Sequence, residues 1–118
     1  MEHTIFVDFS FEAAHMLPGL PEGHKCSRLH GHSYKVRVYV AGELDRNGFV
    51  VDFGDIKKAA RPVFDQLDHN FLNQIPGLEN PTSEVLSRWI FLRISQVIPG
   101  LRKVAIRETC TSGAIFTG

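Results

Sequence analysis

The sequence predicts an α+β fold in which strands at both ends of the chain flank two central helices. Two long segments near the N-terminus alternate apolar and mostly polar residues, which is the period of a half-buried strand. Two central segments repeat apolar residues at helical spacing, and a short hairpin follows near the C-terminus. Because strands grouped in this way pair antiparallel, we expect a four-stranded antiparallel sheet in β-β-α-α-β-β order with both helices on one face.

The two N-terminal segments are expected to form long strands. In the first, from about Thr4 to Ala14, the odd positions are apolar, and in the second, from about His32 to Glu43, the even positions are apolar. The Asn47-Gly48 turn then permits the positive φ angles of a tight hairpin. We therefore expect residues 49–51 to return as the antiparallel partner of the second strand.

Two amphipathic helices are expected in the middle of the chain. Asp52 can cap the first helix, and Pro62 inside it implies a kink or an early break. The inward positions of this helix are Phe53, Ile56, Ala60, Val63 and Leu67. A second helix is expected to start near residues 80–84, where a capping side chain and a proline stand in the first turn, and to run to about Val97.

A C-terminal hairpin is expected to complete the sheet by joining about residues 102–109 to residues 114–117. A sheet of four strands still has two open edges, and an open edge pairs with other chains unless something covers it. We therefore expect the protein to oligomerise through its sheet.

Composition limits the kind of partner that the protein can have. The chain has 118 residues, of which 43% are hydrophobic, and this fits one domain spanning residues 1–118. The 13 Lys and Arg residues balance the 13 Asp and Glu residues, so no basic block indicates nucleic acid and a small molecule is the expected partner. Without a membrane-length apolar stretch or a signal-peptide layout, we expect a cytoplasmic protein.

Three histidines lie on the apolar faces of the first two strands. Side chains at positions i and i+2 of a strand share a face, so His15 faces with the apolar residues of the first strand, and His30 and His32 with those of the second. Three neutral imidazoles can bind a catalytic Zn²⁺ and leave its fourth position open. We therefore expect a zinc site; histidines satisfied by hydrogen bonds in the core are the alternative.

Cys26 stands in the loop between the two strands, four residues before His30. Because a nearby cation lowers the pKa of a thiol, this residue is a candidate nucleophile, general base or fourth zinc ligand. Its polar neighbours in the sequence argue against a buried, inert thiol. Cys110 could form a disulfide with Cys26, but free thiols fit a reducing cytosol better.

Two further features are candidates for chemistry. Asp68-His69 follows the first helix, and a carboxylate that orients an imidazole is a common proton-transfer device, although neighbours in the sequence need not touch. Glu108 falls on the apolar face of the last long strand, where a carboxylate needs a partner. A guanidine-like ligand edge would supply two hydrogen bonds to it, and an internal arginine is the alternative.

Six motifs, taken together and in order, resemble the 6-pyruvoyltetrahydropterin synthase family over nearly the whole chain. They are Phe11-Glu12-Ala13-Ala14-His15, Cys26-Ser27-Arg28-Leu29-His30-Gly31-His32, Val51-Asp52-Phe53, Leu67-Asp68-His69, Asn80-Pro81-Thr82-Ser83-Glu84 and Arg107-Glu108-Thr109. Three residues separate the cysteine from the His-Gly-His pair. This spacing resembles that of the bacterial 6-carboxytetrahydropterin synthases of queuosine biosynthesis, whereas animal-type enzymes carry a longer insertion there.

The resemblance implies a tunnelling fold, in which three subunits join their sheets into a barrel and two barrels stack as a homohexamer with active sites at subunit interfaces. The implied Zn²⁺ ligands are His15, His30 and His32. The other implied site residues are Cys26 as the catalytic thiol, Asp68 and His69 as its assistants from a neighbouring chain, and Glu108 as the anchor of a pterin ring.

The implied reaction converts 7,8-dihydroneopterin triphosphate and water to 6-carboxy-5,6,7,8-tetrahydropterin, acetaldehyde and triphosphate. Lys25 and Arg28 are candidates to bind the triphosphate.

Three alternatives to this reaction stay open. The animal-type reaction eliminates triphosphate without breaking the carbon chain. An aldolase would make 6-hydroxymethyldihydropterin, but such members tend to carry glutamate where Cys26 stands. A non-catalytic, zinc-stabilised module would use Cys26 as the fourth ligand.

Overall fold

The two ends of the chain form one sheet, and the helices come between them in sequence. The computed structural model describes residues 1–109 and 111–118, apart from the side chain of Cys26. Its strands are β1 (His3–His15), β2 (His30–Gly42), β3 (Asn70–Phe71), β4 (Leu101–Arg107) and β5 (Gly113–Thr117). Its helices are α1 (Phe53–Asp65), α2 (Ser83–Ile94) and the short 3-10 turns η1 (Lys25–Ser27) and η2 (Leu72–Gln74).

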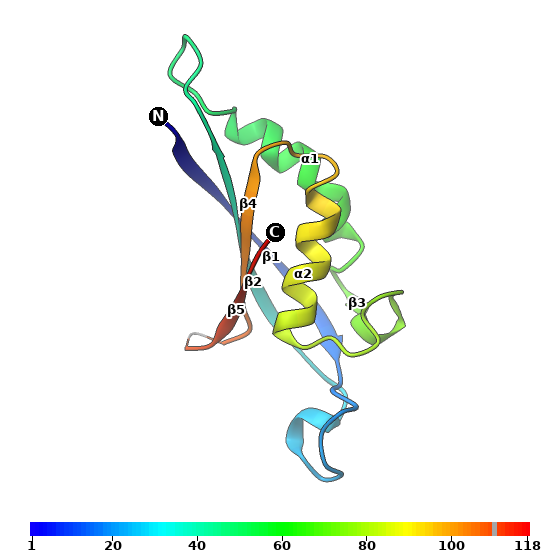
Figure 1. The fold of residues 1–118 in the computed structure, drawn as a ribbon. Coiled ribbons are helices and arrows are strands. Elements are labelled where there is room, and N and C mark those ends of the chain that lie inside the picture. The colour runs from blue at the N-terminus through cyan, green and yellow to red at the C-terminus, as the bar shows by residue number, and fades with distance from the viewer. Residues whose placement is uncertain (110) are drawn as a thin grey trace.

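The sheet has the order β3-β1-β2-β4-β5 and is antiparallel except where β3 runs parallel to β1. β1 and β2 pair along their whole length, from His3 opposite Gly42 to His15 opposite His30. Both α1 and α2 lie on one side of the sheet (Figure 1), which confirms the predicted α+β class. The expected four strands become five, because the two residues of β3 are too few to show an alternation in the sequence.

The alternation of the two long strands separates a buried face from an exposed one. The odd positions of β1 and the even positions of β2 are the more buried ones, and the residues between them are mostly exposed. The buried face forms the core together with inward residues of α1, α2 and β4. Fully buried members of this core include Tyr34, Leu67, Leu86, Ile90 and Ile106.

Residues 49–51 do not form the expected hairpin partner of β2, so that prediction was wrong. Both edges of β2 are occupied, one by β1 and the other by β4, and no position is left for a further strand. Asp45 closes the turn instead. Its Oδ1 accepts hydrogen bonds from the backbone N–H groups of Asn47 at 2.8 Å and Phe49 at 3.0 Å.

α1 begins as predicted, because the side chain of Asp52 accepts a hydrogen bond from the backbone N–H of Gly54 at 2.6 Å. Pro62 does not break the helix, which continues to Asp65. The proline lies on the exposed side, where water can satisfy the carbonyl that loses its donor. The expectation that Phe53 faces inward was wrong: its side chain is 52% exposed, since the start of α1 lies at the margin of the core.

α2 begins at Ser83, within the expected region, but two residues after the proline that was expected in its first turn. Thr82 is the cap, with its Oγ1 accepting a hydrogen bond from the backbone N–H of Val85 at 3.1 Å, so Pro81 lies outside the first turn. The helix ends at Ile94 rather than at Val97, which is 50% exposed. Among the described residues, no helix has the length and apolar character that crossing a bilayer requires.

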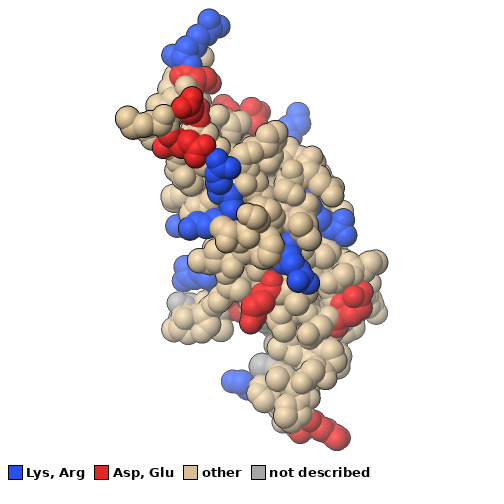
Figure 2. All heavy atoms as spheres, viewed as in Figure 1, with Lys and Arg blue, Asp and Glu red and all other residues tan. Residues whose placement is uncertain are grey.

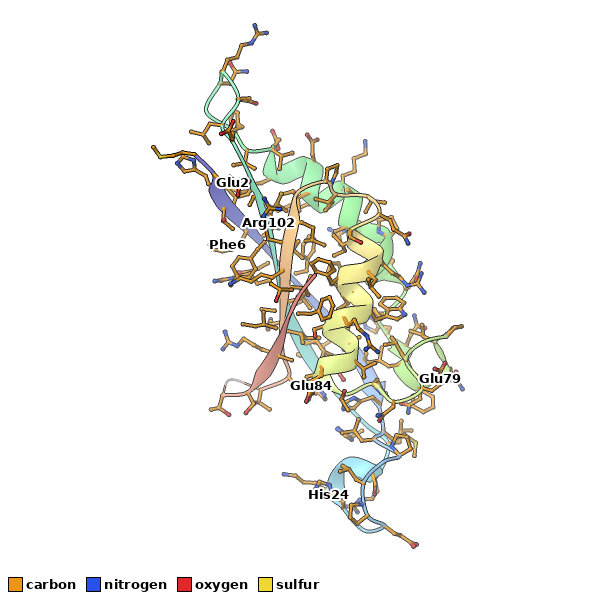
Figure 3. All side chains as sticks on the ribbon, viewed as in Figure 1. Glu2, Phe6, His24, Glu79, Glu84 and Arg102 are labelled. Atoms are coloured by element: carbon orange, nitrogen blue, oxygen red, sulfur yellow. The ribbon has the colours of Figure 1, made fainter. Side chains whose placement is uncertain are left out.

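The segment between β1 and β2 extends away from the rest of the molecule. It contains η1 and projects beyond the strand ends that carry His15 and His30 (Figure 1). On the face shown in Figure 2, basic and acidic side chains are scattered rather than gathered into one patch. At the opposite end of the sheet, Arg102 and Glu2 form an ion pair at 2.8 Å (Figure 3).

Candidate metal centre and its surroundings

Three imidazoles meet at the end of the β1–β2 ladder. His15 stands opposite His30, and Ala13 stands opposite His32. Because side chains two residues apart share a face, His30 and His32 lie on the same side of the sheet as His15, towards the helices. The structure thus brings together the three histidines that the strand pattern placed on matching faces.

The ring nitrogens face one another at short range. The Nε2 atom of His15 lies 3.0 Å from Nε2 of His30 and 3.3 Å from Nε2 of His32. One possible ligand atom from each residue lies within 4.8 Å of the other two. Two nitrogens bound to one tetrahedral zinc at about 2.0–2.1 Å are about 3.3 Å apart, so the observed spacing fits a shared metal ion.

A backbone carbonyl holds the other nitrogen of each ring. The pairs are Nδ1 of His15 with the carbonyl oxygen of Pro81 (3.2 Å), Nδ1 of His30 with that of Arg28 (2.8 Å) and Nδ1 of His32 with that of Ser33 (3.0 Å). A carbonyl only accepts, so each Nδ1 donates its proton and each Nε2 keeps its lone pair. Lone pairs aimed at one point repel each other unless a cation lies between them, and this arrangement is typical of metal-ligating histidines.

Burial favours the neutral form of His15. This residue is 2% exposed. Its burial lowers the pKa of the imidazole from the ordinary value of 6.5, while the negative charge of Glu108 acts in the opposite direction. Since metals bind the neutral imidazole, the lowered pKa favours the ligand form at neutral pH.

Glu108 lies close enough to the centre for its charge to act on both His15 and Tyr34. Its Oε1 is buried and has no hydrogen-bond partner within the described part of the chain, so the alternative of an internal arginine does not account for this atom. Glu108 lines a hollow of about 270 Å³ together with Ser33, Lys35, Arg107 and Thr109. Buried polar atoms normally find partners, and this one therefore indicates a place for a donor ligand.

Tyr34 is a polar neighbour of the centre that the sequence pattern does not single out. Its ring centroid lies 4.2 Å from that of His32, and its buried hydroxyl also lacks a partner among the described residues. Burial raises the pKa of this phenol, and the charge of Glu108 adds to the rise. The only signal in the sequence is a hydroxyl group on an otherwise apolar strand face.

Asp68 and His69 contact each other beside β1, which answers a question that the sequence left open. Asp68 Oδ2 lies 3.0 Å from His69 Nδ1, and Asp68 Oδ1 accepts a hydrogen bond from the backbone N–H of Glu12 at 2.9 Å. The bond from Glu12 and then the contact with His69 lower the pKa of Asp68. His69 has a φ of 59°, in the left-handed region that non-glycine residues rarely adopt.

The Asp68–His69 pair does not join the three-histidine centre of its own chain. The side chain of His69 is 79% exposed and lies outside the cluster of possible ligand atoms. It lines a hollow of about 450 Å³ beside the ends of β1 and β2, together with His32. The pair thus presents an exposed imidazole whose Nδ1 contacts a carboxylate.

The two cysteines are the least described of the candidate residues. The backbone of Cys26 forms the middle of η1 in the projecting loop, and its side chain lies outside the described part of the structure. Cys110 lies outside it altogether. Lys25 and Arg28, the candidates for binding triphosphate, are exposed in the same loop as Cys26.

Known proteins are similar to this chain in both sequence and fold. The family described as 6-pyruvoyl tetrahydropterin synthase matches residues 4–118. The 6-carboxy-5,6,7,8-tetrahydropterin synthase of Synechocystis sp. is 49% identical over 119 residues, which cover 95% of this chain and 91% of that protein. The dihydroneopterin monophosphate aldolase of Pyrococcus furiosus is 38% identical, with 92% of this chain and 91% of that protein covered.

A solved structure gives the same result for the fold. The 6-pyruvoyl tetrahydropterin synthase of Caenorhabditis elegans superposes with a TM-score of 0.91 at 30% identity, covering 100% of this chain and 96% of that one. This likeness confirms that the chain has the predicted tunnelling fold.

Proposed function

Because this chain belongs to the 6-pyruvoyl tetrahydropterin synthase family, we propose that it is a zinc-dependent 6-carboxy-5,6,7,8-tetrahydropterin synthase. The reaction takes 7,8-dihydroneopterin triphosphate and water and releases 6-carboxy-5,6,7,8-tetrahydropterin, acetaldehyde and triphosphate. The observation that carries the proposal is the convergence of three Nε2 atoms from rings that are each held at Nδ1 by a backbone carbonyl. The 49% identical relative of that name supports the choice of reaction.

His15, His30 and His32 hold the metal in this proposal. Three imidazoles are a common donor set for catalytic zinc, which keeps a fourth position for water or substrate. When bound, Zn²⁺ supplies the Lewis acidity that makes a C–H beside a coordinated hydroxyl more acidic. The part of the protein is to present three neutral nitrogens in a fixed orientation, and the three carbonyl contacts support this role.

Cys26 and the Asp68–His69 pair move the protons. Cys26, as a thiolate, removes the acidified proton from the side chain of the substrate. His69 holds or returns a proton, and Asp68 orients its ring through the 3.0 Å contact. The 79% exposure of His69 suits a pair that completes the site of a neighbouring subunit.

Glu108 anchors the pterin ring. The adjacent N–H groups of a pterin match a carboxylate bidentately, and the buried, unpartnered Oε1 supports this assignment. Anchoring the ring at one end determines which side-chain carbon reaches the histidine centre, a positioning effect that contributes to the rate. Lys25 and Arg28 in the projecting loop receive the triphosphate.

We also propose that the domain of residues 1–118 assembles into trimeric barrels that stack as a homohexamer, and that it acts in the cytoplasm in queuosine or other 7-deazaguanine biosynthesis. Within the described chain, β3 pairs with β1 only at Ala13 and Ala14, and β5 forms the other edge of the sheet. Open sheet edges can pair between copies of the chain, and such pairing can close the sheets of several copies into a barrel. Light scattering that finds a monomer would contradict the assembly.

The deciding experiment is to incubate the zinc-loaded protein with 7,8-dihydroneopterin triphosphate and to identify the products by mass spectrometry. 6-Carboxytetrahydropterin together with acetaldehyde supports the proposal. A pyruvoyl product without acetaldehyde would instead indicate the animal-type reaction.

Two other outcomes test the remaining alternatives. 6-Hydroxymethyldihydropterin would indicate an aldolase, and the 38% identical relative makes this arm necessary, although Cys26 stands where such members tend to have glutamate. A non-catalytic zinc module would show no turnover and would unfold on chelation, whereas a catalytic site should lose its activity and largely keep its fold.

A further inference from the structure

We infer that Asn73 is a positioning residue of the three-histidine centre. Its side chain clamps the end of β1 to the loop whose Pro81 carbonyl orients His15. The inference rests on the proposed metal-binding role of the histidines, and it concerns a residue that does not itself reach the metal.

The side-chain amide of Asn73 uses its oxygen and both of its N–H groups. Its Oδ1 accepts a hydrogen bond from the backbone N–H of Met16 at 3.0 Å, and its Nδ2 donates to the carbonyl oxygen of Met16 at 2.8 Å. The same Nδ2 donates to the carbonyl oxygen of Glu79 at 3.2 Å. Met16 directly follows His15, and Glu79 lies two residues before Pro81. One amide therefore ties both segments that determine the position of the His15 ring.

The loop that ends at Pro81 is held at both ends. Asn73 holds it at Glu79, and the Thr82 side chain caps α2 immediately after Pro81. Figure 3 shows Glu79 in this loop, to the side of the lower end of α2. The Pro81 carbonyl between these two points accepts the hydrogen bond from Nδ1 of the buried His15 at 3.2 Å.

The geometry requires asparagine at this position. Aspartate has nearly the same shape, but it has no N–H group and would place a negative charge against the carbonyl oxygens of Met16 and Glu79. Alanine would remove all three hydrogen bonds without adding a charge. In either variant the loop loses its attachment at Glu79, and the Pro81 carbonyl is then held only from the Thr82 side.

The test measures metal affinity rather than turnover. In the metal-free full chain, Co²⁺ and Zn²⁺ are titrated against a chromophoric chelator, and the visible spectrum of bound Co²⁺ reports the ligand geometry. We expect N73D and N73A to bind these metals up to about 10- to 100-fold more weakly than the parent, because displacing the Pro81 carbonyl removes the hydrogen-bond partner of His15 Nδ1. The Co²⁺ spectrum should also change, because the His15 ring is no longer held.

Two control variants separate the clamp from general effects. N47D makes the same chemical change in the exposed turn at the far end of β2. W89F removes the hydrogen bond from Trp89 Nε1 to the Pro76 carbonyl, 3.2 Å, which holds the same loop at another point. Both controls should keep the parental metal affinity, and W89F should do so even if its unfolding temperature falls.

The outcomes decide the inference separately from the proposed function. If the parent chain binds no metal, the proposed function fails and this inference fails with it. If the parent binds metal and folded N73D and N73A bind it equally well with an unchanged Co²⁺ spectrum, only the role of Asn73 is overturned. Should N73D not fold, the uncharged N73A variant decides the question, and if W89F weakens binding as much as N73A, the clamp has no special role.

Discussion

His15 and His30 face each other across the last pair of the β1–β2 ladder, with their Nε2 atoms 3.0 Å apart. The register that places them there also aligns the apolar faces of the two strands. A slip of one residue would move every side chain of a strand to the other face, so burial of the core and assembly of the candidate metal site depend on the same pairing.

Replacing His30 by alanine should deplete the metal. The ring is half-buried at a strand end, so the change removes one ligand with little loss of core packing. Elemental analysis of the purified protein should find about one zinc per chain in the parent and much less in H30A. The matched control is H3A, because His3 is exposed at the other end of β1. Full zinc content in H30A would remove His30 from the ligand set.

Replacing Cys26 by alanine should abolish turnover and spare the metal. Removing a general base typically costs about 10²- to 10⁴-fold in rate. Steady-state kinetics of C26A should therefore show a loss of turnover, whereas its zinc content and pterin affinity should stay at the parental level. C110A is the control and should keep its rate. If C26A loses zinc as well, the thiol is a ligand rather than the base.

Replacing Glu108 by glutamine should weaken the binding of a pterin by about 10- to 100-fold, because one charge-assisted, bidentate contact is lost. Fluorescence titration with the pterin product measures this change. The unfolding temperature of the metal-free protein should not fall, since the buried Oε1 has no partner to lose within the described chain. E43Q, at the far end of β2, controls for the loss of a carboxylate. Unchanged pterin affinity in E108Q would remove the anchoring role.

Asp68 should give the protein an acid-dependent contribution to stability. Its folded-state pKa lies below the ordinary value of 3.8, chiefly because of the hydrogen bond from the Glu12 backbone N–H. The ionised carboxylate therefore stabilises the fold above about pH 4, and this contribution is lost as the pH falls through the lower folded-state pKa.

Urea unfolding of metal-free parent and D68N measures this contribution. The midpoint of the parent should exceed that of D68N at neutral pH, and the difference should shrink as the pH falls to about 2. Turnover of D68N should fall without loss of zinc, because the His69 ring loses its carboxylate acceptor. A difference in midpoint that is independent of pH would show that ionisation of Asp68 does not matter.

The sequence alone determined the features that depend on near neighbours in the chain. The two-residue alternation assigned His15, His30 and His32 to buried strand faces, and the side chain of Asp52 marked the start of α1. The fold class followed from the order of the strand-like and helix-like repeats of apolar residues along the chain. The motifs also identified the family correctly: they are spread along most of the chain, and the family matches residues 4–118.

Only the tertiary structure decided how distant segments meet. The partner of His15 Nδ1 is a carbonyl 66 residues away, at Pro81, and a backbone carbonyl leaves no mark in a sequence because every residue has one. The hydrogen bond from the Glu12 backbone N–H to Asp68 joins segments 56 residues apart, and the loss of the expected strand at 49–51 depends on which segments occupy the edges of β2. Local periodicity determines which face a side chain takes, whereas its partners depend on pairing and packing between segments that are far apart in the chain.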